Sequence, residues 1–90
     1  MSIRIHIPTP MRPHTDNQAV VEASGGTIKA LLDNLGQKYP AISGRLLENG
    51  QVRRFINLYL NDEDIRYLDN LDTAVKDGDE VSISPAVAGG

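Results

Sequence analysis

The chain has 90 residues, of which 40% are hydrophobic and 23% are charged, as in an ordinary globular protein with a single core. It contains no cysteine, which excludes disulfides, thiol nucleophiles and cysteine-based metal sites. No apolar run approaches the roughly 20 residues that cross a bilayer, and no signal-peptide pattern opens the chain. We therefore expect a cytoplasmic protein that contacts no membrane.

The net charge of -3 conceals two regions of opposite sign. Residues 1–61 carry seven Lys and Arg against four Asp and Glu, a net charge of +3, whereas residues 62–80 carry eight acids against Arg66 and Lys76, a net charge of -6. The acid-rich segment argues against nucleic acid as a partner. It either steers the domain toward a basic protein or keeps a loop region solvated, and both interpretations stay open.

The N-terminal segment predicts two strands. Ile3, Ile5 and Ile7 alternate with polar residues, which is the period of a strand with one buried face. Three prolines within residues 8–13 end this strand and predict a long irregular connection to Asp16. A second strand is expected over residues 18–23.

A helix follows, beginning at Thr27, which is placed after two glycines as an N-cap. Apolar residues then recur at helical spacing and predict an amphipathic helix over about Thr27–Lys38; they are Ile28, Leu31, Leu32, Leu35 and Tyr39. Pro40 ends this helix, because a proline forces the preceding residue out of the α region. One more helical turn fits residues 41–47.

The C-terminal half predicts further strands. Residues 55–60 alternate, with Ile56, Leu58 and Leu60 on one face. A turn at residues 61–62 leads to a short strand expected over Ile65–Tyr67, and a turn at residues 77–79 precedes the last strand, Glu80–Ser84. One helix and four to five strands must share a single core, so the helix lies across one face of the sheet. The expected fold class is therefore α+β, in two layers.

The side chains offer little catalytic chemistry. His6 and His14 are the only histidines, and neither belongs to a metal-ligand spacing. The two glycines ahead of the helix lack the rest of a phosphate-binding loop, and the arginines lack the interleaved aromatic residues of a nucleic-acid surface. We therefore expect no metal, no cofactor and no enzymatic activity in this chain. The α-carboxyl of Gly90 is the group that remains.

The sequence ends on Gly89 and Gly90. Ordering glycine carries a large entropy loss, so two bare glycines suit a packed domain poorly. Without a Cβ, however, they can enter a narrow active site, and the five residues beyond Pro85 reach about 17 Å when extended. We predict a domain over residues 1–85 and a flexible tail over residues 86–90, beginning where Pro85 cannot donate to a ladder. A frayed end or an expression leftover is the alternative.

Three segments carry a resemblance to a known family. They are Ile7-Pro8-Thr9 with Arg12-Pro13-His14-Thr15, Arg54-Phe55-Ile56-Asn57 through Tyr59-Leu60-Asn61-Asp62-Glu63-Asp64, and Pro85-Ala86-Val87-Ala88-Gly89-Gly90. Over nearly its whole length the chain resembles the ubiquitin-like sulfur carriers of the ThiS and MoaD type, and these segments resemble the CysO type, which serves cysteine biosynthesis. The resemblance implies a β-grasp fold, with one main helix packed on a mixed sheet of four to five strands.

The resemblance also implies a role for the tail. Such carriers are activated by a MoeB/ThiF-like enzyme, which uses ATP to form an acyl-adenylate on the terminal glycine, and sulfide or a persulfide then displaces AMP to leave a thiocarboxylate. Gly90 would be the reactive residue, and the partner enzymes would bind the residues before it, namely Pro85, Ala86, Val87, Ala88 and Gly89. In the cysteine branch, the thiocarboxylate attacks an aminoacrylate on a pyridoxal-phosphate-dependent cysteine synthase, and a metallopeptidase releases cysteine. ATP and pyridoxal phosphate would belong to those partners.

Other roles stay open at this point. A carrier for molybdopterin or thiamin synthesis would use the same adenylate, as would a ubiquitin-like modifier whose Gly90 is joined to lysines of target proteins. A plain interaction domain with an incidental tail is the remaining alternative. In the carrier roles the chain is a co-substrate and not an enzyme.

Overall fold

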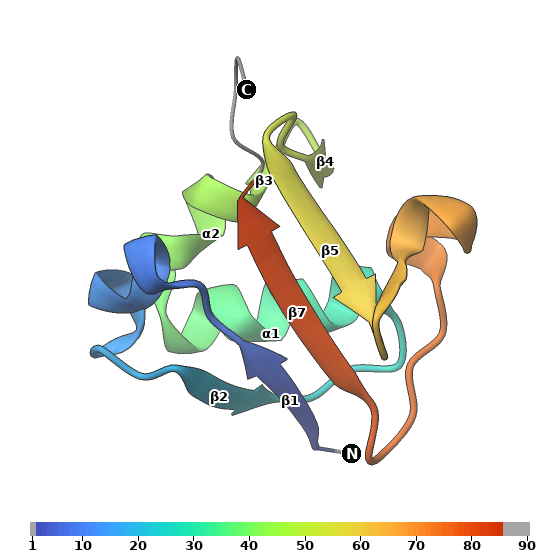
Figure 1. Ribbon diagram of the computed structural model, residues 1–90, viewed down its shortest axis with the longest axis horizontal. Helices are drawn as coiled ribbons and strands as arrows, with labels where there is room; N and C mark the ends of the chain where they lie inside the picture. The colour runs from blue at the N-terminus through green and yellow to red at the C-terminus, as the bar shows by residue number, and fades with distance from the viewer. Residues whose placement is uncertain (1, 86–90) are drawn as a thin grey trace.

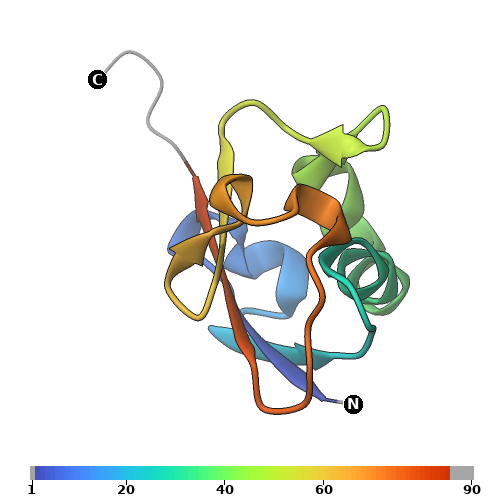
Figure 2. The same cartoon turned by 90° about the vertical axis from the view of Figure 1, so that its right-hand side faces the viewer.

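Two layers make up the part of the chain that the structure describes, residues 2–85 of a computed structural model. Helices α1 and α2 cover one face of a five-stranded sheet, as the two views in Figure 1 and Figure 2 show. The elements in chain order are β1 (Ile3–His6), η1 (Thr9–Thr15), β2 (Val20–Ala23), α1 (Ile28–Lys38), α2 (Pro40–Leu46), β3 (Leu47–Glu48), β4 (Gln51–Val52), β5 (Ile56–Leu60), β6 (Glu63–Asp64), η2 (Ile65–Tyr67), η3 (Asn70–Asp72) and β7 (Glu80–Pro85), where η marks a 3-10 helix. The predicted α+β class and two layers are confirmed.

The last strand, β7, lies at the centre of the sheet. The strand order is β2-β1-β7-β5-β6. On one side β7 pairs in parallel with β1, so that Ile5 lies opposite Val81, and on the other side it pairs antiparallel with β5, so that Leu58 lies opposite Ile83. The sheet is therefore mixed, and the first and last strands of the chain run side by side in the same direction.

Helix α1 forms where the sequence predicts it. Thr27 caps it, because its side-chain hydroxyl accepts a hydrogen bond from the Ala30 backbone N–H at 3.2 Å. The apolar stripe of α1 is buried against the sheet residues that the strand period selects. The two sets are Ile28, Leu31, Leu32 and Leu35 from the helix, and Ile3, Ile5, Leu58, Val81 and Ile83 from the sheet, with Ile56 partly buried beside them.

Two segments differ from the expected irregular loops. The proline-rich connection is a 3-10 helix, η1, which tolerates Pro10 in its first turn and places Met11 and Thr15 in the interior. Residues 47–52, expected as the end of a helix and a loop, form instead a small antiparallel hairpin of β3 and β4. Its turn is Asn49-Gly50, where both residues have positive φ angles of 54° and 76°, as a two-residue hairpin requires.

The short strand expected over Ile65–Tyr67 is wrong in position. The strand β6 is Glu63–Asp64, two residues earlier, and residues 65–67 are the 3-10 helix η2. The Asn61-Asp62 turn has positive φ angles of 50° and 70° at its two residues, so it closes a tight hairpin in which Leu60 pairs with Glu63. Helix η2 then turns Ile65 into the core.

The burial of α1 predicts a large loss of stability on truncation. Leu31 is 0% exposed between the helix and the sheet. Leu31→Ala should lower the free energy of unfolding by about 2–5 kcal/mol, because it removes buried methyl groups and leaves a cavity. Urea unfolding followed by circular dichroism measures this, with exposed Gln37→Ala as the matched change on the opposite face of α1. Equal stability of the two variants would show that the core is wrongly placed.

A second prediction concerns the glycines before α1. A Cβ added to Gly25 would lie 2.6 Å from the Leu31 backbone N, whereas one added to Gly26 would meet nothing within 4 Å. Gly25→Ala should therefore push the helix away and lower the free energy of unfolding by about 1–3 kcal/mol, while Gly26→Ala should change it by less than about 0.5 kcal/mol. The same unfolding experiment compares them, and equal losses at both positions would contradict the close approach of Gly25 to α1.

Candidate functional site

Of the residues predicted to react or to bind partner enzymes, the structure describes one. Pro85 is the last residue of β7, is exposed, and pairs with Ile56 of β5. Gly90, the predicted reactive residue, and Gly89, Ala88, Val87 and Ala86, the predicted docking residues, lie outside the described residues. Their roles and the division into residues 1–85 and 86–90 therefore stay predictions.

The position of Pro85 is fixed by the sheet. Because β1 and β7 are parallel, the carboxyl ends of both strands meet at one end of the molecule, and η1 follows β1 there. Because β5 and β7 are antiparallel, the start of β5 lies at this same end. We call this end the exit face; the start of β5 lies at the top of Figure 1. It includes Arg54 and Phe55, which directly precede β5, and Arg53 and Arg45, which line one depression beside η1. Pro85, the last residue that the structure describes, lies at the exit face.

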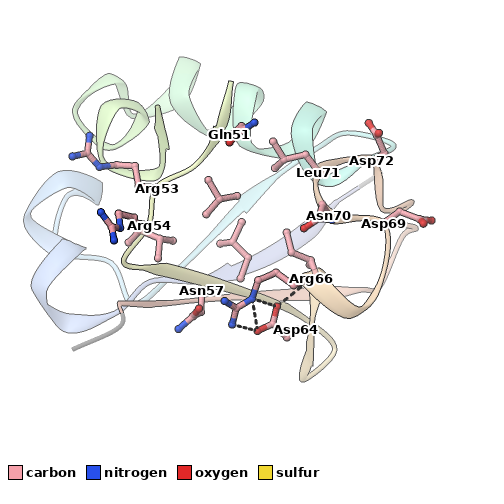
Figure 3. Close-up of a pocket in the computed structure, with 14 residues that line it drawn as sticks. Gln51, Arg53, Arg54, Asn57, Asp64, Arg66, Asp69, Asn70, Leu71 and Asp72 are labelled. Atoms are coloured by element: carbon pink, nitrogen blue, oxygen red, sulfur yellow. Dashed lines mark hydrogen bonds and ion pairs between the residues drawn. The ribbon is translucent and has the colours of Figure 1, made fainter. Parts of the chain in front are cut away.

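A groove of about 590 Å³ opens beside β5, between the β4 strand and residues 64–72 (Figure 3). Its floor is apolar and continuous with the core, from Val52, Ile56, Leu58, Ile65 and Leu71. Its rim carries both charges, from Arg53, Arg54, Arg66, Asp64, Asp69 and Asp72. The lining residues include no hydroxyl, thiol or imidazole, so the groove offers contacts but no side-chain nucleophile of those kinds.

An ion pair fixes one side of this groove. Arg66 donates from Nη2 to Asp64 Oδ2 at 2.7 Å, and its backbone N–H donates to Asp64 Oδ1 at 2.9 Å. The hydrogen bond from the Arg66 side chain, followed by that from its backbone, lowers the pKa of Asp64 below its usual value, and the same pair raises the pKa of Arg66. Asp64 therefore stays ionised and cannot serve as a general acid near neutral pH.

The opposite end of the sheet holds a second polar network. Asn61 donates from Nδ2 to Asp79 Oδ1 at 3.1 Å and accepts from the Glu80 backbone N–H at 3.0 Å. Asp79 Oδ2 also accepts from the Lys76 backbone N–H at 2.9 Å. These bonds, the one from Asn61 first, lower the pKa of Asp79. The network ties the 61–62 turn to the 77–79 turn, far from Pro85.

The histidines do not form a site. His6 lies on the solvent side of β1, with Nε2 at 2.6 Å from Glu80 Oε1, and His14 is half-buried in a depression between η1 and α2. Among residues 2–85 no group of three His, Asp or Glu could hold a metal ion. In the same residues no helix has the length and apolarity needed to span a bilayer.

Comparison with known proteins supplies the family. The sequence model of the ThiS family matches residues 5–90. The chain belongs to the ThiS family. It is 48% identical to the sulfur carrier protein CysO of Mycobacterium tuberculosis over the whole of both chains. It is 41% identical to the small archaeal modifier protein 3 of Haloferax volcanii over 71% of this chain and 70% of that protein.

A solved structure confirms the fold of this ThiS-family chain. It superposes with a TM-score of 0.92 on a chain of the BexX/CysO complex of Amycolatopsis orientalis, at 43% identity, covering 98% of this chain and 99% of the other. The resemblance to CysO-type carriers and the ubiquitin-like β-grasp fold, one main helix on a mixed sheet, are therefore both confirmed.

Sequence reasoning missed the groove beside β5 and the grouping of Phe55 with the arginines. Phe55 was assigned to a strand by its alternation, but it precedes β5 and is 51% exposed. The sequence does show that Arg53, Arg54 and Phe55 stand at the start of a predicted strand. It does not show at which end of the sheet that strand begins.

The Asp79 network gives this ThiS-family domain a pH-dependent stability. The pKa of Asp79 is lower in the folded than in the unfolded chain, so its stabilisation is fully present above the ordinary value of 3.8 and is lost as the pH falls through the folded-state value. The difference in unfolding free energy between the parent and Asp79→Ala should therefore shrink between pH 7 and pH 3. Urea unfolding at both pH values measures it, with exposed Asp72→Ala as the background. A difference that stays constant would contradict the network.

Proposed function

We propose that this protein is a sulfur carrier, a co-substrate and not an enzyme, and that its reactive group is the carboxyl of Gly90. The observation that supports this most strongly is the 48% identity to the M. tuberculosis sulfur carrier protein CysO over the full length of both chains. The ThiS-family match also runs through residue 90, so it includes the Gly89-Gly90 pair.

The proposed chemistry follows from the weakness of a carboxylate as an electrophile. A free α-carboxyl has a pKa of about 3.3–3.7 and is ionised at neutral pH, which protects its carbon from attack by a sulfur nucleophile. A MoeB/ThiF-like partner would therefore join a carboxylate oxygen of Gly90 to the α-phosphate of ATP and release pyrophosphate. Hydrosulfide would then attack the acyl carbon and release AMP, leaving one sulfur in place of one oxygen.

The carrier would then deliver its sulfur in cysteine biosynthesis. The thiocarboxylate would add to an aminoacrylate held by a pyridoxal-phosphate-dependent cysteine synthase, forming the carbon–sulfur bond of cysteine. The acyl group would then move from the sulfur to the amine of the new cysteine, and a metallopeptidase would hydrolyse that amide, which releases cysteine and restores the Gly90 carboxylate. In this scheme ATP and pyridoxal phosphate bind to the partner enzymes, and we place the exchange in the cytoplasm.

The folded domain would serve as a handle for the reactive end. Pro85 ends the central strand β7 and pairs with Ile56 of β5, so the sheet holds the point from which the tail begins. The residues proposed to bind the partner enzymes are Pro85, Ala86, Val87, Ala88 and Gly89. A small residue at position 89 suits a narrow channel, because glycine adds no Cβ.

A second function has its own support. The 41% identity to the small archaeal modifier protein 3 favours a role as a protein modifier, in which a lysine amine would attack the same Gly90 adenylate. The two functions differ in what displaces AMP. A carrier for molybdopterin or thiamin synthesis would share the thiocarboxylate but deliver it to a different synthase.

The loading of Gly90 can be measured directly. Incubation with the cognate adenylating enzyme, ATP and sodium sulfide should exchange one oxygen of the chain for sulfur, and fragmentation of the intact protein in a mass spectrometer should place the sulfur on Gly90. Deleting Gly90 should abolish the exchange, and Gly89→Val should impair it, because a β-branched side chain restricts the backbone. Surface Gly26→Ala, at which an added Cβ would meet no atom within 4 Å, should load normally.

Two outcomes would contradict this function. Normal loading of the chain without Gly90 would show that the sulfur is carried elsewhere. Stable amide linkage of Gly90 to lysines in the presence of sulfide, without any thiocarboxylate, would favour the modifier. Addition of the cysteine synthase and serine-derived substrate to the loaded chain then tests the cysteine branch, which fails if no cysteine adduct forms on Gly90.

A further inference from the structure

The exit face combines positive charge with an exposed aromatic side chain. Arg45, Arg53 and Arg54 are all exposed there. Arg53 Nη1 donates to the Gly44 backbone oxygen at 3.0 Å, which holds its guanidinium over α2, where Arg45 and His14 line the same depression. The arginines are thus gathered at one end of the molecule by β5, α2 and η1 together.

Phe55 lies beside one of these arginines, Arg54. It is the only phenylalanine of the chain and is 51% exposed. The Arg54 guanidinium lies 5.5 Å from the centre of its ring, close enough for a cation–π contact. Phe55 immediately precedes Ile56, the partner of Pro85 in the sheet. Exposed aromatic and arginine side chains are the types that dominate binding energy at protein interfaces.

The charge at this end is opposite to that at the other end of β7. The two segments that build the exit end, residues 9–16 and 40–56, carry four arginines (Arg12, Arg45, Arg53 and Arg54) and two acids (Asp16 and Glu48), a net charge of +2. The turns at the other end carry Asp62, Glu63, Asp77, Asp79 and Glu80 against Lys76, a net charge of -4. The length of β7, at about 3.3 Å per residue, separates the two ends by about 17 Å.

We propose that the exit face is the docking surface for the adenylating enzyme, and that this partner surrounds the opening of its active site with carboxylates and an apolar pocket for Phe55. The proposal rests on the proposed function. It follows from the net positive charge of this end and from the position of Pro85, the last described residue, which lies at the same end. The acidic turns then face away from the partner, and the field of the whole domain orients it before contact.

The arginines and Phe55 should contribute differently. Exposed charges act over a Debye length of about 10 Å at 0.1 M salt and are screened above it, so the arginines should set the rate of encounter at low salt. Phe55 should act after contact, by filling an apolar pocket, and its contribution should persist at high salt.

The test measures the steady-state rate of Gly90 loading by the cognate adenylating enzyme, with ATP and sulfide. Comparing this rate at about 20 mM and about 300 mM sodium chloride, below and above the 0.1 M at which the Debye length is about 10 Å, separates the two contributions. The double variant Arg53→Gln/Arg54→Gln should raise KM for the carrier about tenfold at low salt, with kcat unchanged, and should flatten its salt dependence. Phe55→Ala should raise KM about tenfold at both salt concentrations. The single variant Arg54→Gln keeps the hydrogen bond from Arg53 to Gly44, so it tests the charge without removing that structural contact. Thermal melting of each variant checks that the domain is still folded.

The matched control is Lys29→Gln/Lys76→Gln, which removes the same charge from two exposed residues away from the exit face. It should leave KM near the parent value at both salt concentrations. An equal rise in KM for this control and the arginine variant would reduce the effect to net charge and overturn the docking surface, as would an unchanged KM for the arginine and Phe55 variants. Absence of loading in the parent chain would instead count against the proposed function.

Discussion

The pairing of β7 along both of its edges is the constraint on which the rest of this structure depends. β7 is the last strand in the sequence and the middle strand of the sheet, parallel to β1 and antiparallel to β5. Val81 and Ile83 then point into the core against α1. The parallel pair requires a long connection between its strands, and the whole body of the domain, including both helices, is that connection. The same pairing gives the terminal residues a fixed starting point at Pro85.

Much of this fold could be predicted from the sequence, because its main elements bury one face with a clear period. The alternation of Ile3, Ile5 and Ile7 and the helical spacing of the leucines in α1 selected the observed core. The predicted elements are wrong where local turn and proline geometry, rather than the hydrophobic period, decides the backbone conformation. Three prolines predict an irregular loop, yet the φ angle of proline also suits a 3-10 helix, which is what residues 9–15 form. Residues 65–67 follow a tight hairpin, which depends on the left-handed φ angles of Asn61 and Asp62 and is therefore hard to recognise in the sequence.

The candidate site could be predicted only in part. The role of Gly89 and Gly90 stays a prediction, since both lie outside residues 2–85, whereas the lack of cysteine and of spaced histidines does follow from the sequence. The exit face could not be predicted, because Arg45, Arg53 and Arg54 acquire a common direction only through the antiparallel β5–β7 pair and the packing of α2 against η1. Counting charge along the chain located the acid-rich segment, but the sheet topology sets which end of the molecule its turns occupy.

The parallel β1–β7 pair also separates Ser2 from Pro85, the first and last residues that the structure describes. Ser2 lies beside the acidic turns, where its backbone N–H donates to Asp77 Oδ1 at 2.9 Å, while Pro85 lies at the far end of the neighbouring strand. A fluorophore, affinity tag or surface anchor attached ahead of Ser2 is therefore held on the side of the domain away from the exit face. The side of the domain at Ser2 is therefore the natural place to immobilise or label this protein, because attachment there leaves the exit face uncovered.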